Sequence, residues 1–319
     1  MTDDGRITTP FGAQTTAAEV VKGVDLTGLR AIVTGGSSGI GVETARALAA
    51  AGAEVTLAVR DLEAGKKVAE DISAGTGNDR VLVAPLDLDD RPSIRAFVAD
   101  WRGPLHILVN NAGVMASPET RTAEGWELQF ATNHLGHFAL TTGLHDALKA
   151  AAGARVVVVS SVGHINGDVR FDDIHFERDP YDAWAAYSQS KTANILFAVE
   201  AAKRWADDGI SVNALNPGRI AETNLARHIG TPTNAPASFE PGKNSGVSVK
   251  NIEQGAATSV LLAASPLVAG VTGRYFEDCN EAGPHQPGLR RGVAGYALDE
   301  RSAARLWQVS LDMLSSAAN

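Results

Sequence analysis

Tyr187 and Lys191 stand four residues apart in the stretch AAYSQSKTANILFAVEAAKRW. Four residues make about one helical turn, so both side chains would leave the same face of one helix. An ammonium ~4 Å from a phenol favours the phenolate by about 4 kcal/mol at an effective dielectric of ~20, or roughly three pKa units. The pair therefore predicts acid–base chemistry at Tyr187 with a pKa lowered by Lys191, although an ordinary amphipathic helix with a surface lysine shows the same spacing.

A glycine-rich turn follows the first predicted strand. Residues 30–34 (RAIVT) are typical of a buried strand and run into GGSSGIG, after which an alanine-rich pattern predicts a helix. Glycines let the backbone approach phosphate closely, and the helix N-terminus offers free N–H groups to a pyrophosphate. In this strand–turn–helix context the turn predicts dinucleotide binding by Gly35, Ser37, Ser38, Gly39 and Ile40.

The second predicted strand, 53–59, decides which dinucleotide is expected. Val59 at its end cannot bind the ribose hydroxyls of NAD as a carboxylate would, whereas Arg60 can pair with a 2′-phosphate and stack on adenine. The sequence therefore favours NADP over NAD. The alternative for Arg60 is a solvated loop charge that Asp61 partly neutralises.

Two further strand ends would complete the cofactor cleft, because ligands of open α/β sheets bind at the carboxyl ends of strands. The strand at 81–88 ends in Asp87 and Leu88, which would flank the adenine. The strand at 105–110 is followed by Asn111, Ala112 and Gly113, which suit a tight turn lining the same cleft.

Five motifs occur in order between about residues 28 and 276: TGxxxGxG, NNAG, a strand ending in Ser-Ser, YxxxK and Asn-Pro-Gly. Together they resemble the short-chain dehydrogenase/reductase family. Residues 160–197 resemble its retinol-dehydrogenase-like and WW-domain-oxidoreductase-like branch, and PGRIAETNLARH is similar to a part of light-dependent protochlorophyllide reductases.

The resemblance implies a role for each matching residue. Tyr187 would be the general acid in carbonyl reduction or the base in alcohol oxidation, with Lys191 bonded to the nicotinamide ribose. Ser161 would donate to the substrate oxygen, with Ser160 as the competing serine, and Asn133 would hold a water in a proton relay. Pro217, Gly218 and Ile220 would lie by the nicotinamide, and Thr223 near its carboxamide or the phosphates. Glu222 departs from the family here, because it occupies a slot that the family usually fills with threonine or serine.

Alternating strand and helix patterns predict an α/β fold: a single-domain, Rossmann-type, doubly wound parallel sheet with helices on both faces. Residues 1–27 are expected to form an N-terminal arm, and residues 28–319 the dinucleotide-binding catalytic domain with a substrate lid at about 222–250. The acidic, aromatic insert 171–184 is expected to form a flap over the catalytic face. Further strands are expected at 154–160, 210–216 and 273–276, and helices at 124–150, 184–207, 252–264 and 299–315.

Composition narrows the partners and the location. The formal net charge of −9 argues against nucleic acid or an anionic membrane surface. No apolar run is long enough to span a membrane, and residues 1–27 lack the features of a signal peptide. Cys279 is the single cysteine, so a cytoplasmic protein is expected. Family members often pair through the helices expected at 124–150 and 184–207, so a homodimer or homotetramer is an open prediction.

Several polar residues have plainer interpretations. His134 and His137 lack a further ligand cluster, so no metal is predicted. His164 is expected either at the edge of the substrate pocket or in a loop, and Trp184 either in the pocket wall or in the core. The carboxylates Glu277, Asp278 and Glu281 are expected to form a solvated face.

The predicted function is hydride transfer between NADP(H) and a small-molecule alcohol or carbonyl substrate. Reduction of an activated C=C bond is the first alternative, suggested by PGRIAETNL. A catalytically silent NADP-binding sensor or scaffold is the second, although such proteins tend to lose the tyrosine or the lysine. The substrate itself is not predicted.

Overall fold

The structure, a computed structural model, describes residues 5–220, 223, 225 and 246–316. Most of the predicted substrate lid at about 222–250 and Glu222 lie outside the described residues. Among those described, no helix is long and apolar enough to cross a bilayer.

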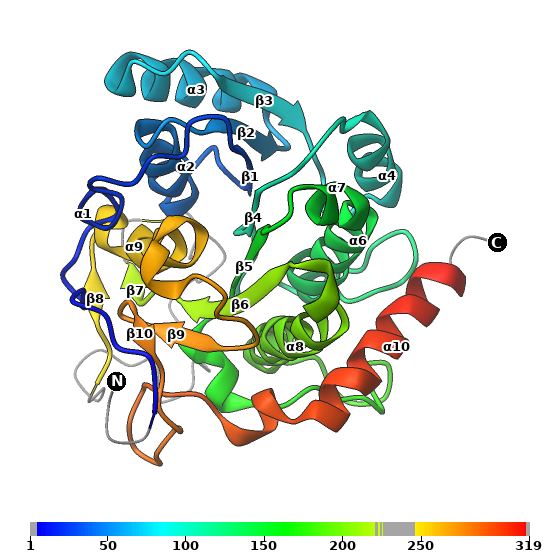
Figure 1. Ribbon diagram of the computed structural model, residues 1–319. Helices are drawn as coiled ribbons and strands as arrows, with labels where there is room; N and C mark the ends of the chain where they lie inside the picture. Colours follow the sequence, from blue (N-terminus) through cyan, green and yellow to red (C-terminus); the bar gives the residue numbers. More distant parts are fainter. Residues whose placement is uncertain (1–4, 221–222, 224, 226–245, 317–319) are drawn as a thin grey trace.

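A sheet of eight strands forms the centre of the molecule (Figure 1). Its order is β10-β9-β6-β5-β4-β1-β2-β3, and all neighbours are parallel except β9 and β10. This confirms the predicted doubly wound sheet. The strands are β1 (Arg30–Thr34), β2 (Glu54–Val59), β3 (Val81–Pro85), β4 (Ile107–Asn110), β5 (Arg155–Val159), β6 (Ser211–Asn216), β9 (Tyr275–Glu277) and β10 (Asn280–Glu281), with a separate pair β7 (Arg219–Ile220) and β8 (Val249–Lys250).

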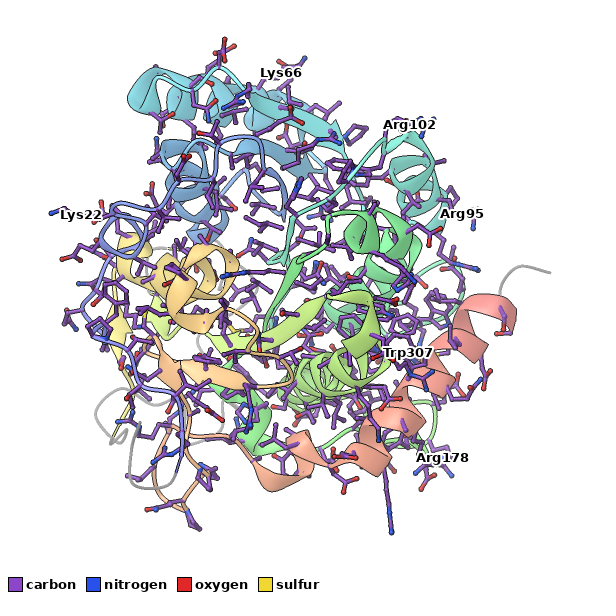
Figure 2. The ribbon with its side chains drawn as sticks, in the orientation of Figure 1. Lys22, Lys66, Arg95, Arg102, Arg178 and Trp307 are labelled. Atoms are coloured by element: carbon purple, nitrogen blue, oxygen red, sulfur yellow. The ribbon has the colours of Figure 1, made fainter. Side chains whose placement is uncertain are left out.

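Helices cover both faces of the sheet (Figure 1), and an apolar core lies between the sheet and the helices on each face. One face carries α1 (Ala17–Val20), α2 (Ile40–Ala50), α3 (Leu62–Thr76) and α9 (Ile252–Ala264). The other face carries α4 (Arg91–Asp100), α5 (Leu128–Phe130), α6 (Gly136–Gly143), α7 (His145–Ala150), α8 (Ala183–Arg204) and α10 (Glu300–Ser316). Charged side chains such as Lys66 and Arg95 project outward, whereas Trp307 of α10 stacks on Phe197 of α8 with ring centroids 5.9 Å apart (Figure 2).

The single helix expected at 124–150 is wrong in detail. The helix begins only at Leu128, because the buried Glu127 carboxylate caps it by accepting from the backbone N–H of Gln129 and Phe130 at 2.9 and 2.7 Å. Residues Ala131–Leu135 then form a π-helical turn, and a break at Leu144 separates α6 from α7. Single π-turns often occur at functional sites, and this one carries Asn133.

The N-terminal residues pack on the sheet edge rather than standing apart. The Ile7 carbonyl accepts from the backbone N–H of Glu281 at 2.9 Å, and Ala17 and Val20 of α1 are buried in the core beneath α9. The boundary between arm and catalytic domain stays a prediction.

The insert 171–184 packs on the chain before α5 and on α8, where the Gln189 side-chain amide donates to the Ile174 carbonyl at 2.7 Å. Its Tyr181 hydroxyl donates to a Glu127 carboxylate oxygen at 3.1 Å. Of its residues, Trp184 alone lines the cleft, so a flap of the whole insert over the catalytic face is not found.

Candidate active site

A cleft of about 730 Å³ opens at the carboxyl ends of the parallel strands. It brings together eighteen of the nineteen predicted site residues, all except Asn133. They are Gly35, Ser37, Ser38, Gly39, Ile40, Arg60, Asp87, Leu88, Asn111, Ala112, Gly113, Ser161, Tyr187, Lys191, Pro217, Gly218, Ile220 and Thr223.

The glycine turn has the geometry that a phosphate cradle requires. Gly35 and Gly39 have φ of 66° and 58°, a region that residues with a Cβ rarely adopt. A Cβ on Gly41 would lie 2.6 Å from both the Gly35 carbonyl oxygen and the Asn111 amide nitrogen. Gly39 precedes α2 without any side-chain cap, so the first N–H groups of that helix face the cleft. These residues fit a dinucleotide pyrophosphate.

Asn111 ties the turn after β4 to β1. Its side-chain amide donates to the Thr34 carbonyl at 2.8 Å, while its backbone N–H donates to the Thr34 hydroxyl at 2.9 Å. Its side-chain oxygen is buried and has no hydrogen-bond partner among the described residues. Because a buried amide oxygen normally has a partner, Asn111 fits a bound ligand with a donor group.

Positive and negative side chains lie together at the end of the cleft where the adenine is expected. Arg60 is exposed directly after β2, and Asp61 is occupied as the cap of α3, where it accepts from Ala64 N–H at 3.0 Å. A hydrogen bond with Asp87 is the largest cause that raises the pKa of Asp89 to about 6, while the Arg60 charge acts in the opposite direction. The Arg60 charge therefore acts on this carboxyl pair, and its exposed guanidinium is accessible to a phosphate.

Tyr187 and Lys191 leave α8 on the face that borders the cleft, as the spacing predicts. Asp182 caps this helix by accepting from the N–H of Trp184 and Ala185, both at 2.8 Å. The Lys191 ammonium lies 5.7 Å from the Tyr187 ring centroid and donates to the Val159 carbonyl at 3.2 Å. The side chain of Trp184 meets the Tyr187 ring edge to face, with centroids 6.4 Å apart.

The predicted lowering of the Tyr187 pKa by Lys191 is wrong. Burial raises the pKa of Tyr187 to about 12, and the groups acting in the opposite direction are Ser161, through a hydrogen bond, and Arg290, through its charge. Burial also lowers the pKa of Lys191 to about 8. Desolvation thus outweighs the effects of Ser161 and Arg290 on the Tyr187 pKa.

The two serines after β5 have different partners. The Ser160 hydroxyl donates to the Lys191 carbonyl at 2.7 Å and so holds α8 against the sheet. The Ser161 hydroxyl accepts from Gly163 N–H at 3.0 Å and also hydrogen-bonds with the Tyr187 hydroxyl, so both hydroxyls lie at the same part of the cleft. A Cβ on Gly163 would lie 2.9 Å from the Tyr187 ring, so a glycine lets the serine turn approach the phenol.

Asn133 lies behind the cleft, fully buried in the π-helical turn. Its side-chain oxygen accepts from Val114 N–H at 2.8 Å, and its amide donates to the Val114 carbonyl and the Ser190 hydroxyl, both at 2.9 Å. It therefore fixes the chain after Gly113, and its role in a proton relay stays a prediction. The nearby His137 and His134 bond separately to Thr34 and Ser310, and burial lowers their pKa values to about 4 and about 3.

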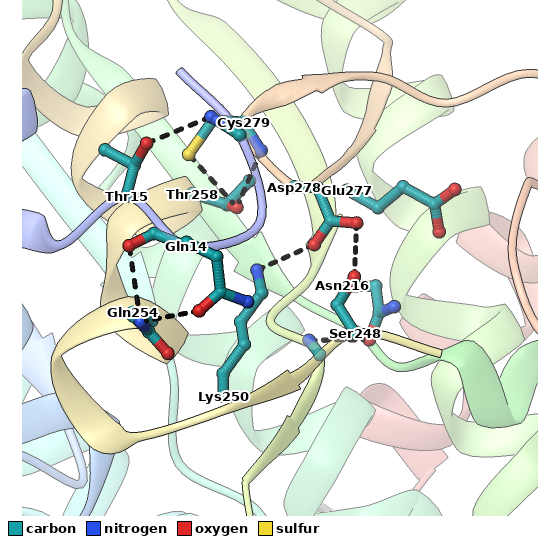
Figure 3. Close-up of polar contacts among 12 residues, drawn as sticks. Gln14, Thr15, Asn216, Ser248, Lys250, Gln254, Thr258, Glu277, Asp278 and Cys279 are labelled. Atoms are coloured by element: carbon teal, nitrogen blue, oxygen red, sulfur yellow. Dashed lines mark hydrogen bonds and ion pairs between the residues drawn. The ribbon is translucent and has the colours of Figure 1, made fainter. Parts of the chain in front are cut away.

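The carboxylates expected on a solvated face are largely buried, and that expectation is wrong. Asp278 pairs with the ammonium of Lys250 at 2.8 Å and accepts from the Ser248 hydroxyl at 2.6 Å (Figure 3). The Lys250 side chain is 0% exposed. A Cβ on Gly218 would lie 3.0 Å from the Lys250 stem, so the lysine supports the cleft wall that includes Pro217 and Gly218.

Arg290 and Arg219 line the cleft but were not predicted. Arg290 is buried, and burial lowers its pKa to about 10, with Arg219 adding to this effect and Tyr187 opposing it. No sequence signal marks Arg290, because it stands in a Gly- and Pro-rich segment far along the chain from every motif.

Known proteins similar to this one align with nearly the whole chain, and a family profile matches well over half of it. The profile of the short chain dehydrogenase family matches residues 30–234. A Streptomyces antibioticus protein named "Probable oxidoreductase" is 54% identical over 92% of this chain and 100% of its own length. Retinol dehydrogenase 12 from Homo sapiens is 41% identical over 91% of this chain and 88% of its own.

Solved structures agree. A crystal structure of an uncharacterised protein from Mycobacterium paratuberculosis has a TM-score of 0.72 at 34% identity, covering 94% of this chain and 97% of that one. The Pseudomonas aeruginosa RhlG/NADP active-site complex has a TM-score of 0.61 at 30% identity, covering 79% and 95%.

The cleft and these matches define a dinucleotide-dependent oxidoreductase of the short-chain dehydrogenase/reductase family, to which the chain belongs. Within this NAD(P)-using family it falls in the retinol-dehydrogenase-like branch.

Proposed function

We propose that the protein is an NADP-preferring reductase and dehydrogenase that interconverts a carbonyl compound and its alcohol, with Tyr187 as the general acid or base. The observation that carries the proposal is the shared cleft, which holds the glycine turn at one end and Ser161, Tyr187 and Lys191 at the other. A bound nicotinamide would supply or accept the hydride.

The side chains of this chain would manage the proton and the charge. In reduction the Tyr187 hydroxyl, with its pKa raised to about 12, remains protonated and donates to the substrate oxygen as negative charge develops there. Ser161 donates a second hydrogen bond to the same oxygen, and donors aimed at developing charge stabilise the transition state more than the ground state. Lys191, which borders both Tyr187 and Gly113, would hold the nicotinamide ribose.

The preference for NADP is supported by Arg60, exposed where an adenosine 2′-phosphate would lie, and by the similar Pseudomonas aeruginosa complex with NADP. Apolar side chains at the catalytic end, among them Met115, Val162 and Trp184, favour an apolar part of the substrate. Because the chain is 41% identical in sequence to retinol dehydrogenase 12, we include retinaldehyde in the test panel.

A substrate panel tests the proposal. The purified protein is incubated with NADPH or NADH and with aldehydes, ketones, retinaldehyde or enones, and cofactor oxidation and products are followed. We expect NADPH-dependent formation of alcohols. Saturation of the C=C bond with the carbonyl retained would instead assign a C=C reductase, and cofactor binding without any turnover would assign a silent sensor.

A further inference from the structure

His164 stands three residues after Ser161 but does not reach the cleft. Its side chain is 0% exposed, so the expectation that it edges the substrate pocket is wrong. The imidazole Nδ1 lies 2.7 Å from the Ser161 carbonyl oxygen, and Nε2 lies 3.1 Å from the backbone nitrogen of Ala294. The ring therefore bridges the serine turn and the C-terminal segment.

The Ser161 carbonyl and the Ala294 N–H assign the tautomer of this imidazole, and the Tyr275 hydroxyl lies farther from Nδ1, at 3.4 Å. A carbonyl oxygen can only accept, so Nδ1 must carry the proton, and a backbone N–H can only donate, so Nε2 must be bare. Burial lowers the pKa of His164 to about 4, which keeps the ring neutral near physiological pH. Both hydrogen bonds are thus satisfied by a single neutral form.

Further contacts hold both the backbone and the ring of His164 in place. The His164 carbonyl accepts from the Tyr296 hydroxyl at 2.6 Å, and the ring meets Tyr275 edge to face with centroids 5.1 Å apart. Ser161 is the cap of the short helix Val162–Asn166. Any shift of the imidazole would therefore move the Ser161 backbone, which borders Tyr187.

We propose that His164 is a positioning residue: its Nδ1–H holds the Ser161 carbonyl and thereby orients the Ser161 hydroxyl toward the reacting oxygen. This rests on the proposed function, in which Ser161 donates to that oxygen. Small displacements of a donor from the transition state lower the rate strongly, so a residue that never touches substrate can still affect turnover.

Two amide substitutions separate the two hydrogen bonds. In His164→Asn the side-chain nitrogen can occupy the place of Nδ1 and keep the bond to Ser161, while the bond from Ala294 is lost. In His164→Gln the side-chain oxygen can occupy the place of Nε2 and accept from Ala294, while the bond to Ser161 is lost. Each variant thus loses one buried hydrogen bond, and each serves as the stability control for the other.

We expect His164→Gln to lower kcat by roughly 10- to 100-fold with NADPH affinity unchanged, and His164→Asn to stay within about threefold of the parent. Steady-state kinetics give kcat and KM for the carbonyl substrate, and fluorescence titration gives the Kd for NADPH. Equal losses of kcat in both variants, or a loss confined to the Kd for NADPH, would overturn the role of His164.

A measurement on the unaltered protein guards against variants that fail to fold. Imidazole nitrogen chemical shifts of ¹⁵N-labelled protein should report a neutral Nδ1–H ring for His164 that does not titrate near the ordinary pKa of ~6.5. An Nε2–H ring, or titration near that pH, would contradict the bridge. Absence of carbonyl turnover in the parent would count against the proposed function, whereas these shifts test the bridge without any turnover.

Discussion

The two ends of the cleft are built in different ways. The cofactor end is formed by short segments that directly follow β1, β2, β3 and β4, and each has its own local signal in the sequence. The catalytic end combines Ser161, Tyr187, Pro217 and Arg290, which are spread over more than a hundred residues of the chain. The first end follows from local backbone rules, whereas the second follows from tertiary packing.

The difference extends to the chemistry. A phosphate cradle needs positive φ and close approach, which the glycines provide through their own backbone. The acidity of Tyr187 depends instead on how deeply α8 is buried and on which charges surround it. Substitutions at the two ends should therefore affect different kinetic constants.

The largest effect is expected for Tyr187→Phe, which removes the proton donor and leaves the cofactor end unchanged. Because general acid catalysis contributes about 10²- to 10⁴-fold, kcat should fall by roughly 10³-fold while the Kd for NADPH changes little. Steady-state kinetics and cofactor titration separate the two constants.

Tyr181→Phe is the matched control, since Tyr181 lies in the insert 171–184 and its hydroxyl bonds to Gln129, Glu127 and Ser117. It should lower stability by about 1 kcal/mol and leave kcat near that of the parent. Comparable turnover in Tyr187→Phe and the parent would refute the catalytic role of Tyr187.

The second largest effect is expected at the buried ion pair beneath Gly218. Lys250→Met removes one partner and leaves the Asp278 carboxylate without its counter-charge, so the free energy of unfolding should fall by about 3 kcal/mol. Denaturant unfolding measures it. The ion pair supports the catalytic end of the cleft, because Lys250 of β8 lies against Gly218 in the cleft wall that follows β6.

The double variant Lys250→Met/Asp278→Asn sharpens the test. Asp278 has φ of 51°, a conformation that asparagine tolerates well, so the second change relieves the unpaired charge without backbone strain. Part of the stability should return. A double variant that is no more stable than Lys250→Met would mean that the ion pair is not the source of the loss.

The sequence was sufficient for the sheet, the glycine turn and the cofactor end, because strand–turn–helix patterns are local. The place of Ser161, Pro217 and Thr223 in the same cleft was expected only from the resemblance to the family. The sequence was not sufficient for Arg290, whose place in the cleft depends on how the segment after β10 folds back. The acidic run Glu277–Asp278 looks solvated in sequence, but its partners lie elsewhere in the chain: Lys250, 28 residues earlier, pairs with Asp278, and the buried Glu277 accepts from Gly292 N–H at 2.9 Å. His164 likewise requires Ala294, 130 residues away, before its function can be inferred.

A smaller effect is expected at the cofactor end for Arg60→Ala. Losing the cation that would pair with a 2′-phosphate should reduce the ratio of kcat/KM for NADPH to that for NADH by roughly 10-fold. Arg95→Ala, which removes an exposed charge on α4, is the control and should leave the ratio unchanged. If Arg60→Ala lowers both kcat/KM values equally, Arg60 does not select the cofactor.

The smallest effect is expected for Arg290→Leu, which tests whether the C-terminal segment tunes the catalytic end. The Arg290 charge acts to lower the pKa of Tyr187, so its removal should raise that pKa further. Alcohol oxidation requires phenolate and therefore speeds up as pH rises toward the pKa of Tyr187. The rising limb of its pH profile should consequently move to higher pH, by less than about one pH unit because the cleft is partly solvated. Arg290→Lys keeps the charge and should restore the limb. A limb that stays in place in Arg290→Leu would show that the Arg290 charge does not influence the phenol, and a limb that moves to lower pH would show an influence of the opposite sign; either result would contradict the proposed tuning of Tyr187 by Arg290.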